Sequence, residues 1–286
     1  MAHVNQAETL RKLRHLIIDM DGVLYRGNEA IPGMDGFVRF LREWGIGFVL
    51  ATNNSTRTLQ QYVDKLAGMG VTIHADAPSR WWPRRGQSIG EVLTSAQATA
   101  GYLTSVAPPG TRVFVVGMDG LWVALREAGF DLVEDGAEFV VVGMDFSICY
   151  QRLAQAALLI RAGARFIGTN PDRTFPSERG IVPGAGALLA FLEAATGVTP
   201  TVIGKPETAM IEQALAHMDA RPATTAMLGD RLETDILAGQ RAGLLTLLVL
   251  SGVTDEAMLA ESEIQPDLVF RDVGHLRAVW QEALDG

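Results

Sequence analysis

Acidic side chains follow a short apolar run near the N-terminus, in a spacing suited to cation-assisted chemistry. Asp19 and Asp21 come directly after the run Leu16 to Ile18, and Gly22 follows them. If the extended geometry of the run continues, residues two apart project to the same side, and glycine permits the sharp turn that comes next. Two carboxylates so close repel each other. We therefore expect this stretch to bind a cation.

Three later apolar runs also end in polar residues. Thr52, Asn53 and Asn54 follow the first of these runs, Lys205 follows the second and Asp230 the third. Ligands of open parallel sheets bind beyond the carboxyl ends of the strands, so we expect these side chains at one edge of a sheet. Asp230 then joins the first two aspartates in an all-oxygen acidic trio, which Mg²⁺ prefers and zinc does not. Magnesium is the expected metal.

These residue types fit the hydrolysis of a phosphate monoester. A carboxylate that attacks a phosphate dianion is repelled by it, and a metal ion helped by Lys205 removes that repulsion. Asp19 is the expected nucleophile, which forms an aspartyl-phosphate. Asp21 is expected to protonate the leaving alkoxide and later to accept a proton from the hydrolytic water.

Other residues of the set have supporting roles. Thr52, with the amides of Asn53 and Asn54, is expected to bind the non-bridging phosphate oxygens at a strand-to-helix turn. Asp235 lies one turn into the helix that follows the last acidic motif. We expect it to fix Lys205 by an ion pair.

A parallel sheet would bring these residues together, and the hydropathy pattern predicts one. Short apolar runs alternate with amphipathic stretches of helix length, which is typical of an α/β fold with helices on both faces of the sheet. The runs assigned to the core are Leu16 to Ile18, Phe48 to Ala51, Val202 to Ile203, Ala226 to Leu228, Leu244 to Leu250 and Leu268 to Phe270.

The middle of the chain has its own alternation of strands and helices. We predict an inserted α/β domain over 107–182, between the two parts, 1–106 and 183–286, of a discontinuous core domain. The pentapeptide VVGMD occurs twice in the insert, from residues 115 and 141. We interpret the copies as two similar strand-to-turn units of one sheet.

Composition limits the partners. The 286 residues are 48% hydrophobic, which excludes a disordered chain, and the net charge of −9 leaves no positive background for a nucleic-acid polymer. Cys149 is the single cysteine, so an intrachain disulfide is excluded and a reducing cytoplasm is favoured. The N-terminal stretch has no signal-peptide pattern, and the run Leu244 to Leu250 is too short to span a membrane, so no membrane partner is expected.

Four motifs carry a resemblance to a known family. HLIIDMDGVLY, ATNNS, VIGKP and MLGDRLETDILAG resemble the motifs of the haloacid dehalogenase (HAD) superfamily, and most closely those of its class IIA, 4-nitrophenylphosphatase-like enzymes. The resemblance covers nearly the whole chain. It implies a Rossmann-like parallel-sheet core, a C2-type cap between the second and third motifs, and phosphatase activity on small metabolites such as sugar phosphates or nucleotides.

The resemblance also assigns roles to matching residues. It implies Asp19 as nucleophile, Asp21 as acid and base, and Thr52 and Lys205 as phosphate ligands. Mg²⁺ would be bound by Asp19, the backbone carbonyl of Asp21, and Asp230.

The cap of this class contacts the leaving group, and the matching stretch here is Thr169 to Pro176. Asn170 and Asp172 are the expected contacts. Caps of this class often pair two subunits, which implies a homodimer through the inserted domain. The segment 74–90, rich in tryptophan and arginine, is longer than this class usually has before its cap; we interpret it as a surface excursion whose tryptophans pack on the domain it leaves.

Other functions stay open at this point. Carbon–halogen hydrolysis on the same fold needs neither a second aspartate nor a metal, so Asp21 and Asp230 argue against it. A phosphomutase shares the first half of the mechanism and is separated only by its products. A receiver-like signalling domain is far shorter, and the intact acidic trio argues against a binding protein without activity.

Overall fold

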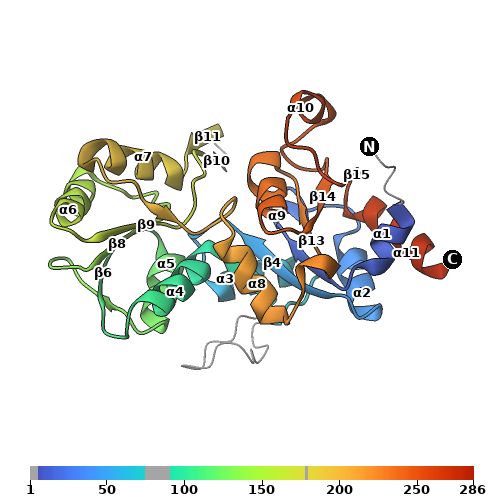
Figure 1. The fold of residues 1–286 in the computed structure, drawn as a ribbon, viewed down its shortest axis with the longest axis horizontal. Coiled ribbons are helices and arrows are strands. Elements are labelled where there is room, and N and C mark those ends of the chain that lie inside the picture. The colour runs from blue at the N-terminus through green and yellow to red at the C-terminus, as the bar shows by residue number, and fades with distance from the viewer. Residues whose placement is uncertain (1–5, 75–90, 178–179) are drawn as a thin grey trace.

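The computed structural model describes residues 6–74, 91–177 and 180–286, and its two larger sheets are both parallel (Figure 1). The first sheet has six strands in the order β15–β14–β13–β1–β4–β5, and every pairing in it is parallel. Its strands are β1 (His15–Ile18), β4 (Gly47–Thr52), β5 (Val92–Thr94), β13 (Thr225–Gly229), β14 (Leu245–Val249) and β15 (Leu268–Phe270).

Side chains of the central strands alternate between two apolar clusters, one on each face of this sheet. Leu16 and Ile18 pack in one cluster, and Ile17, Val49 and Met227 pack in the other. Both faces are buried, as parallel sheets require. One face is covered by α1 (Gln6–Lys12), α2 (Met34–Glu43), α3 (Leu59–Gly68) and α11 (Val273–Asp285), and the other by α4 (Ser95–Val106), α8 (Ala209–Met218) and α9 (Leu237–Arg241).

The second sheet is built by the insert. It has five parallel strands in the order β12–β9–β8–β6–β7. Val115 pairs with Val141, so the two VVGMD copies are neighbouring strand-to-turn units. The α/β fold with an inserted parallel-sheet domain is therefore confirmed. The elements are β6 (Arg112–Val116), β7 (Asp131–Leu132), β8 (Phe139–Val142), β9 (Arg165–Gly168), α5 (Asp119–Glu127) and α6 (Tyr150–Arg161).

The second sheet extends beyond residue 182, where sequence reasoning ends the inserted domain. Leu189 and Leu192 of α7 (Ala185–Thr196) pack in one cluster with residues of β6 and β8. The run assigned to the core at Val202 to Ile203 forms β12 (Thr201–Val202), which pairs with β9 through Thr201 and Ile167. The assignment of this run to the core sheet is wrong, because its backbone hydrogen-bonds to β9 of the second sheet.

The two domains share one apolar core. Val113 of β6 and Leu125 of α5 belong to the same buried cluster as Ile17 and Met210 of the core domain. Helix α4 packs against both α5 and α8 and so connects the two sheets. The insert is thus fixed to the core by buried side chains as well as by its connecting segments.

Two short hairpins complete the elements near the strand ends: β2 (Tyr25–Arg26) with β3 (Glu29–Ala30), and β10 (Thr174–Ser177) with β11 (Gly180–Pro183). The remaining helix, α10 (Glu256–Glu261), follows β14. Residues 75–90 of the tryptophan-containing segment lie outside the described residues. In the part of the chain that the structure describes, no helix has the length and apolarity needed to span a bilayer.

Candidate active site

Asp19 follows β1, the central strand that lies between β4 and β13. Its backbone amide donates to the carbonyl of Leu228 at 2.8 Å, so strand pairing holds the residue beside the end of β13. Its carboxylate accepts a hydrogen bond from Lys205 Nζ at 2.6 Å. Only 9% of Asp19 is exposed. Register, rather than chance proximity, therefore sets its position.

Lys205 is buried and uses its ammonium group to connect three segments. Nζ donates to Asp19 Oδ1 at 2.6 Å, to Asp235 Oδ1 at 2.7 Å and to the carbonyl of Ala51 at 2.9 Å. Burial alone would lower the pKa of Lys205, but the two carboxylates raise it above its ordinary value. The ammonium group is therefore charged at neutral pH and 1% exposed.

Asp235 lies in a π-helical turn, η2 (Leu232–Ile236), that follows β13. Its Oδ1 accepts from Lys205, and its Oδ2 accepts from the backbone amide of Arg231 at 3.1 Å. A Cβ at Gly229 would lie 2.1 Å from the Cβ of Asp235, so the close approach of turn and strand requires glycine there. Both carboxylate oxygens of Asp235 are engaged by the protein.

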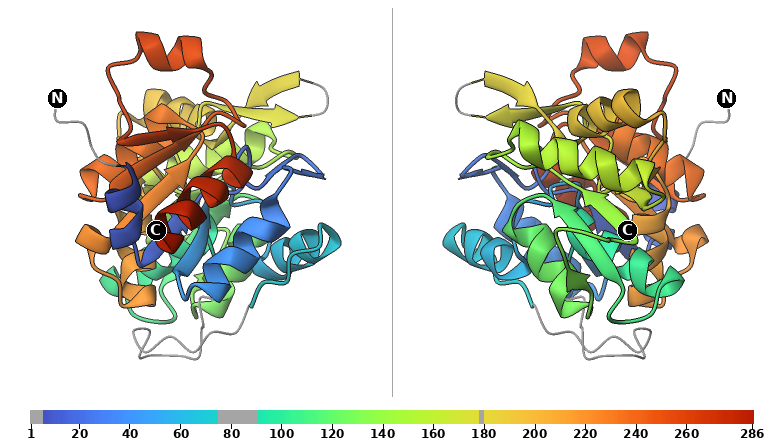
Figure 2. Two further views of the ribbon diagram at one scale, coloured as in Figure 1. Left: turned by 90° about the vertical axis from the view of Figure 1, so that its right-hand side faces the viewer. Right: turned by 90° about the vertical axis from the view of Figure 1, so that its left-hand side faces the viewer.

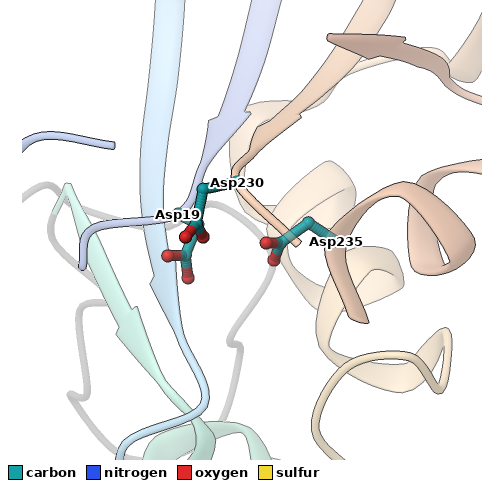
Figure 3. A group of neighbouring side chains, drawn as sticks. All are labelled: Asp19, Asp230 and Asp235. Atoms are coloured by element: carbon teal, nitrogen blue, oxygen red, sulfur yellow. The ribbon is translucent and has the colours of Figure 1, made fainter. Parts of the chain in front are cut away.

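Asp230 has one oxygen bonded and one without a partner. Oδ2 accepts from the amide of Val253 at 2.7 Å, while the buried Oδ1 has no hydrogen-bond partner in the described parts of the chain. Asp19, Asp230 and Asp235 each place one carboxylate oxygen within 4.8 Å of the others (Figure 3). A Cβ on Gly252 would lie 1.9 Å from Asp230 Oδ2, so this neighbour too must be glycine.

This all-oxygen cluster fits a divalent cation. Because Asp235 is already occupied by Lys205 and a backbone amide, Asp19 and the unpartnered oxygen of Asp230 are the better ligands. Among the described residues, the group of mutually close carboxylates does not include Asp21, which sequence reasoning places in the trio. A contribution of Asp21 through its backbone carbonyl stays a prediction.

The pKa of Asp230 makes metal binding testable without turnover. Burial, and then the charge of Asp235, raises the pKa of Asp230 to about 7. An unfolded aspartate has a pKa of about 4. The metal-free native state therefore binds the proton more tightly than the unfolded state, and its stability falls as pH rises between these values.

Asp230→Asn is expected to raise the melting temperature of the metal-free protein at about pH 8, because the variant removes a buried, unpaired charge. It should also remove the stabilisation by Mg²⁺. In the native sequence this stabilisation is about 2.7 kcal/mol when the free Mg²⁺ concentration is a hundred times the dissociation constant. Melting curves in EDTA and in Mg²⁺ measure both effects. An unchanged response to Mg²⁺ would contradict the assignment of Asp230 as a ligand.

Asp21 is open to a cavity in front of the acidic cluster. The surrounding protein atoms raise its pKa, against the opposing charges of Lys65 and Arg231. Lys65 Nζ lies 3.6 Å from the centroid of the Tyr25 ring, and burial lowers the pKa of Lys65 to about 8. A raised pKa makes a carboxyl group better suited to giving a proton to a leaving group.

The loop after β4 is folded by its own side chains. Thr52 Oγ1 accepts from the amide of Asn54 at 3.2 Å, and Asn54 Oδ1 accepts from the amide and hydroxyl of Thr56. The side chain of Asn54 is thus used to shape the loop. α3 begins after this loop with a capping box, in which the side chains of Thr58 and Gln61 each accept from the other's backbone amide.

Asn53 links the core to the insert. Its Nδ2 donates to the carbonyl of Lys205 at 2.8 Å and lies 3.2 and 3.3 Å from the two carboxylate oxygens of Asp172. Asn170 is buried, and its Nδ2 donates to the carbonyl of Asn53 at 2.7 Å. Burial raises the pKa of Asp172, against the hydrogen bond from Asn53. Asn170 and Asp172 thus both bond to Asn53 of the core, and both line the cavity.

The cavity that joins these residues has a volume of about 680 Å³ and is lined by both domains. It brings together the sequence-predicted residues Asp19, Asp21, Thr52, Asn53, Asn54, Asn170, Asp172, Lys205, Asp230 and Asp235. Arg57, Lys65, Phe146 and Phe175 line it too. Sequence reasoning singled out none of the four, although Phe175 lies in the stretch Thr169 to Pro176 that the family resemblance places at the leaving group. Arg57 lies two residues after the ATNNS motif, but its type and spacing alone do not separate it from a surface arginine.

Comparisons with known proteins agree with this geometry. Residues 16–131 match a family model described as haloacid dehalogenase-like hydrolase, and residues 202–276 match one described as HAD-hydrolase-like. An acid sugar phosphatase of Staphylococcus saprophyticus is 36% identical over 268 residues, which are 93% of this chain and 98% of that relative. The chain belongs to the haloacid dehalogenase-like hydrolases. The resemblance of the four motifs to this family is thereby confirmed.

Solved structures place this haloacid dehalogenase-like hydrolase beside known phosphatases. A 4-nitrophenylphosphatase of Thermotoga maritima is 35% identical with a TM-score of 0.87, and the match covers 96% of this chain and 99% of that one. A glycerol phosphate phosphatase of Mycobacterium tuberculosis, solved in complex with magnesium, is 33% identical with a TM-score of 0.83, over 96% of this chain and 79% of that one. The magnesium in that relative supports the metal predicted from the oxygen ligands.

Proposed function

We propose that this chain is a Mg²⁺-dependent phosphomonoester hydrolase that works through an aspartyl-phosphate on Asp19. One observation carries the proposal: the carboxylate of Asp19 accepts from the charged Lys205 and shares a carboxylate cluster with Asp230, whose buried Oδ1 has no partner among the described residues. The lysine and a cation shared with Asp230 would offset the charge of both the nucleophile and the phosphate that it attacks.

The charge of the cavity supports a dianionic substrate. Five basic and five acidic side chains line it: Arg26, Arg57, Lys65, Lys205 and Arg231, and Asp19, Asp21, Asp172, Asp230 and Asp235. With Asp21 protonated as the acid, the five basic groups exceed the four remaining carboxylates by one positive charge, and a divalent cation raises that excess to three. The positive excess favours binding of the phosphate dianion.

The proposed reaction divides its steps among the metal ion, Asp19, Asp21 and the phosphate ligands. Magnesium, held by Asp19 and Asp230, would neutralise charge on the phosphoryl oxygens. An Asp19 carboxylate oxygen attacks phosphorus as the bond to the leaving oxygen breaks, and Asp21 gives that oxygen its proton. Water then attacks the phosphorus of the aspartyl-phosphate, Asp21 accepts a proton from the water, and inorganic phosphate leaves with Asp19 restored. The hydroxyl of Thr52 would bind a non-bridging oxygen, and Lys205 would contribute its positive charge beside it. Direct contact of Lys205 with the phosphate stays a prediction, because its three N–H groups are engaged by Asp19, Asp235 and the carbonyl of Ala51.

The substrates are small phosphorylated metabolites. The names of the relatives point to sugar phosphates, glycerol phosphate and aryl phosphates, and the cavity is of a size usual for small-molecule sites. A homodimer through the inserted domain and a cytoplasmic location stay predictions.

The direct test is phosphate release by the purified protein from a panel of phosphomonoesters in Mg²⁺ and in EDTA. We expect release that requires Mg²⁺ and produces the free alcohol and inorganic phosphate. Recovery of an isomeric phosphate ester would identify a phosphomutase instead. Binding of every ester without any product would identify a silent binding protein.

A second test addresses the role of Asp21. Asp21→Asn removes the transferable proton, so turnover of alkyl phosphates, whose leaving groups are poor, is expected to fall by about 10²- to 10⁴-fold. Turnover of 4-nitrophenyl phosphate should fall much less, because nitrophenolate leaves without protonation. Steady-state kinetics on both esters give the comparison. An equal loss on the two would argue against Asp21 as the acid.

A further inference from the structure

Two phenylalanines of the inserted domain form an aromatic wall of the cavity. The rings of Phe146 and Phe175 meet at 66° with centroids 5.8 Å apart, and both residues line the cavity that contains Asp19. Phe146 is 58% exposed. Among the residues that the structure describes, Phe146 therefore leaves much of its apolar surface uncovered in a polar site.

Local structure holds the backbone of both phenylalanines in place. Phe146 is in the turn after β8, and this turn is closed by hydrogen bonds from the amide and hydroxyl of Ser147 to Asp145 Oδ1, at 2.9 and 2.8 Å. Phe175 is on β10, where it pairs with Val182 of β11. The hairpin stands out from the body of the second domain (Figure 2).

The hairpin begins two residues after a polar anchor. Asp172 accepts from Asn53 Nδ2 of the core at 3.2 Å, which holds the start of the hairpin over the acidic cluster. On the core side the cavity is lined by the exposed Val253, whose amide donates to Asp230. The space next to the phosphate-binding residues therefore has an apolar surface on both domains.

We propose that this aromatic wall binds the leaving group and selects phosphomonoesters whose alcohol carries a flat aromatic or heteroaromatic ring. The inference rests on the proposed phosphatase function. An edge-to-face pair with a free face can accept a third ring by stacking, which contributes beyond the apolar area buried. A short polyol leaves the wall exposed to water and gains nothing from it.

Binding of unreactive phosphonates tests the wall apart from turnover. In Mg²⁺, the native protein is expected to bind phenylphosphonate about five- to tenfold more tightly than 2,3-dihydroxypropylphosphonate, measured by calorimetry. Phe146→Ala and Phe175→Ala should each remove most of that preference. Phe191→Ala is the matched control, because this exposed phenylalanine of α7 lies outside the cavity; it should keep the preference.

Two conservative variants identify the chemistry of the wall. Phe146→Tyr retains a ring and should retain the preference, whereas Phe146→Leu retains only apolar area and should lose much of it. A Leu variant that binds like the native protein, or native binding without preference, would overturn the inference. Turnover of phenyl phosphate by the native protein is followed in parallel. Native protein that hydrolyses phenyl phosphate but shows no binding preference overturns the inference alone, while native protein without turnover overturns the proposed function.

Discussion

Asp19→Asn is expected to lower phosphate release by a factor of at least about 10⁴, because an amide oxygen cannot replace the carboxylate as nucleophile. The fold should persist. Asparagine can still accept from Lys205, and the substitution removes a buried negative charge whose pKa is already raised by burial and by the neighbouring aspartates. Steady-state kinetics in Mg²⁺ and far-UV circular dichroism measure the two outcomes.

A surface aspartate provides the matched control. Asp35 on α2 pairs with Arg39 at 3.1 Å, and its side chain is 59% exposed. Asp35→Asn should change neither turnover nor stability by a measurable amount. Retained turnover in Asp19→Asn, with Mg²⁺ present and the fold intact, would show that another group attacks phosphorus.

Lys205→Met is expected to produce the largest loss of stability. The variant keeps a side chain of similar length but leaves the carboxylates of Asp19 and Asp235 buried without their cation. Breaking a buried ion pair in this way costs about 3–5 kcal/mol, against a total stability of about 5–15 kcal/mol for a typical protein. Denaturant unfolding in EDTA measures the loss, because Mg²⁺ would itself offset the uncompensated charge.

Two further variants separate the buried pair from a general effect of losing a lysine. Lys12→Met removes an ammonium group that is 67% exposed and paired with Glu8, and the free energy of unfolding should change by less than about 0.5 kcal/mol. Adding Asp235→Asn to Lys205→Met removes one of the orphaned charges and should restore part of the stability. No restoration would show that the two charges are not coupled.

Much of the site could be predicted because the hydropathy pattern shows where the strands end, and the ends of parallel strands meet at one edge of a sheet. The polar residues Asp19, Thr52 and Asp230 each lie at or just beyond the end of a parallel strand of the central three, so the register that buries the strands also brings these residues together. Asp235 and Lys205 could be paired in advance since both follow strand ends.

Other features depend on packing that the sequence pattern does not contain. The run at Val202 is apolar, and apolarity does not say which of two sheets it joins; hydrogen bonding to β9 decides that. Asp21 has the right type and spacing for a shared cation, but the chain turns after β1, and Asp235 takes its place in the carboxylate cluster. The cavity roles of Arg57 and Phe175 follow from neighbours distant in sequence.

The apolar cluster common to both domains limits how this enzyme can be re-engineered. Val113 and Leu121 bury their side chains in an apolar cluster shared with core helices. A fragment containing only the insert would expose this apolar surface to water and aggregate. A chimaera that carries the insert of another phosphatase must also carry that protein's residues on the contacting faces of α4 and α8. To change substrate specificity in this scaffold, the insert and the core helices that it contacts must therefore be exchanged together.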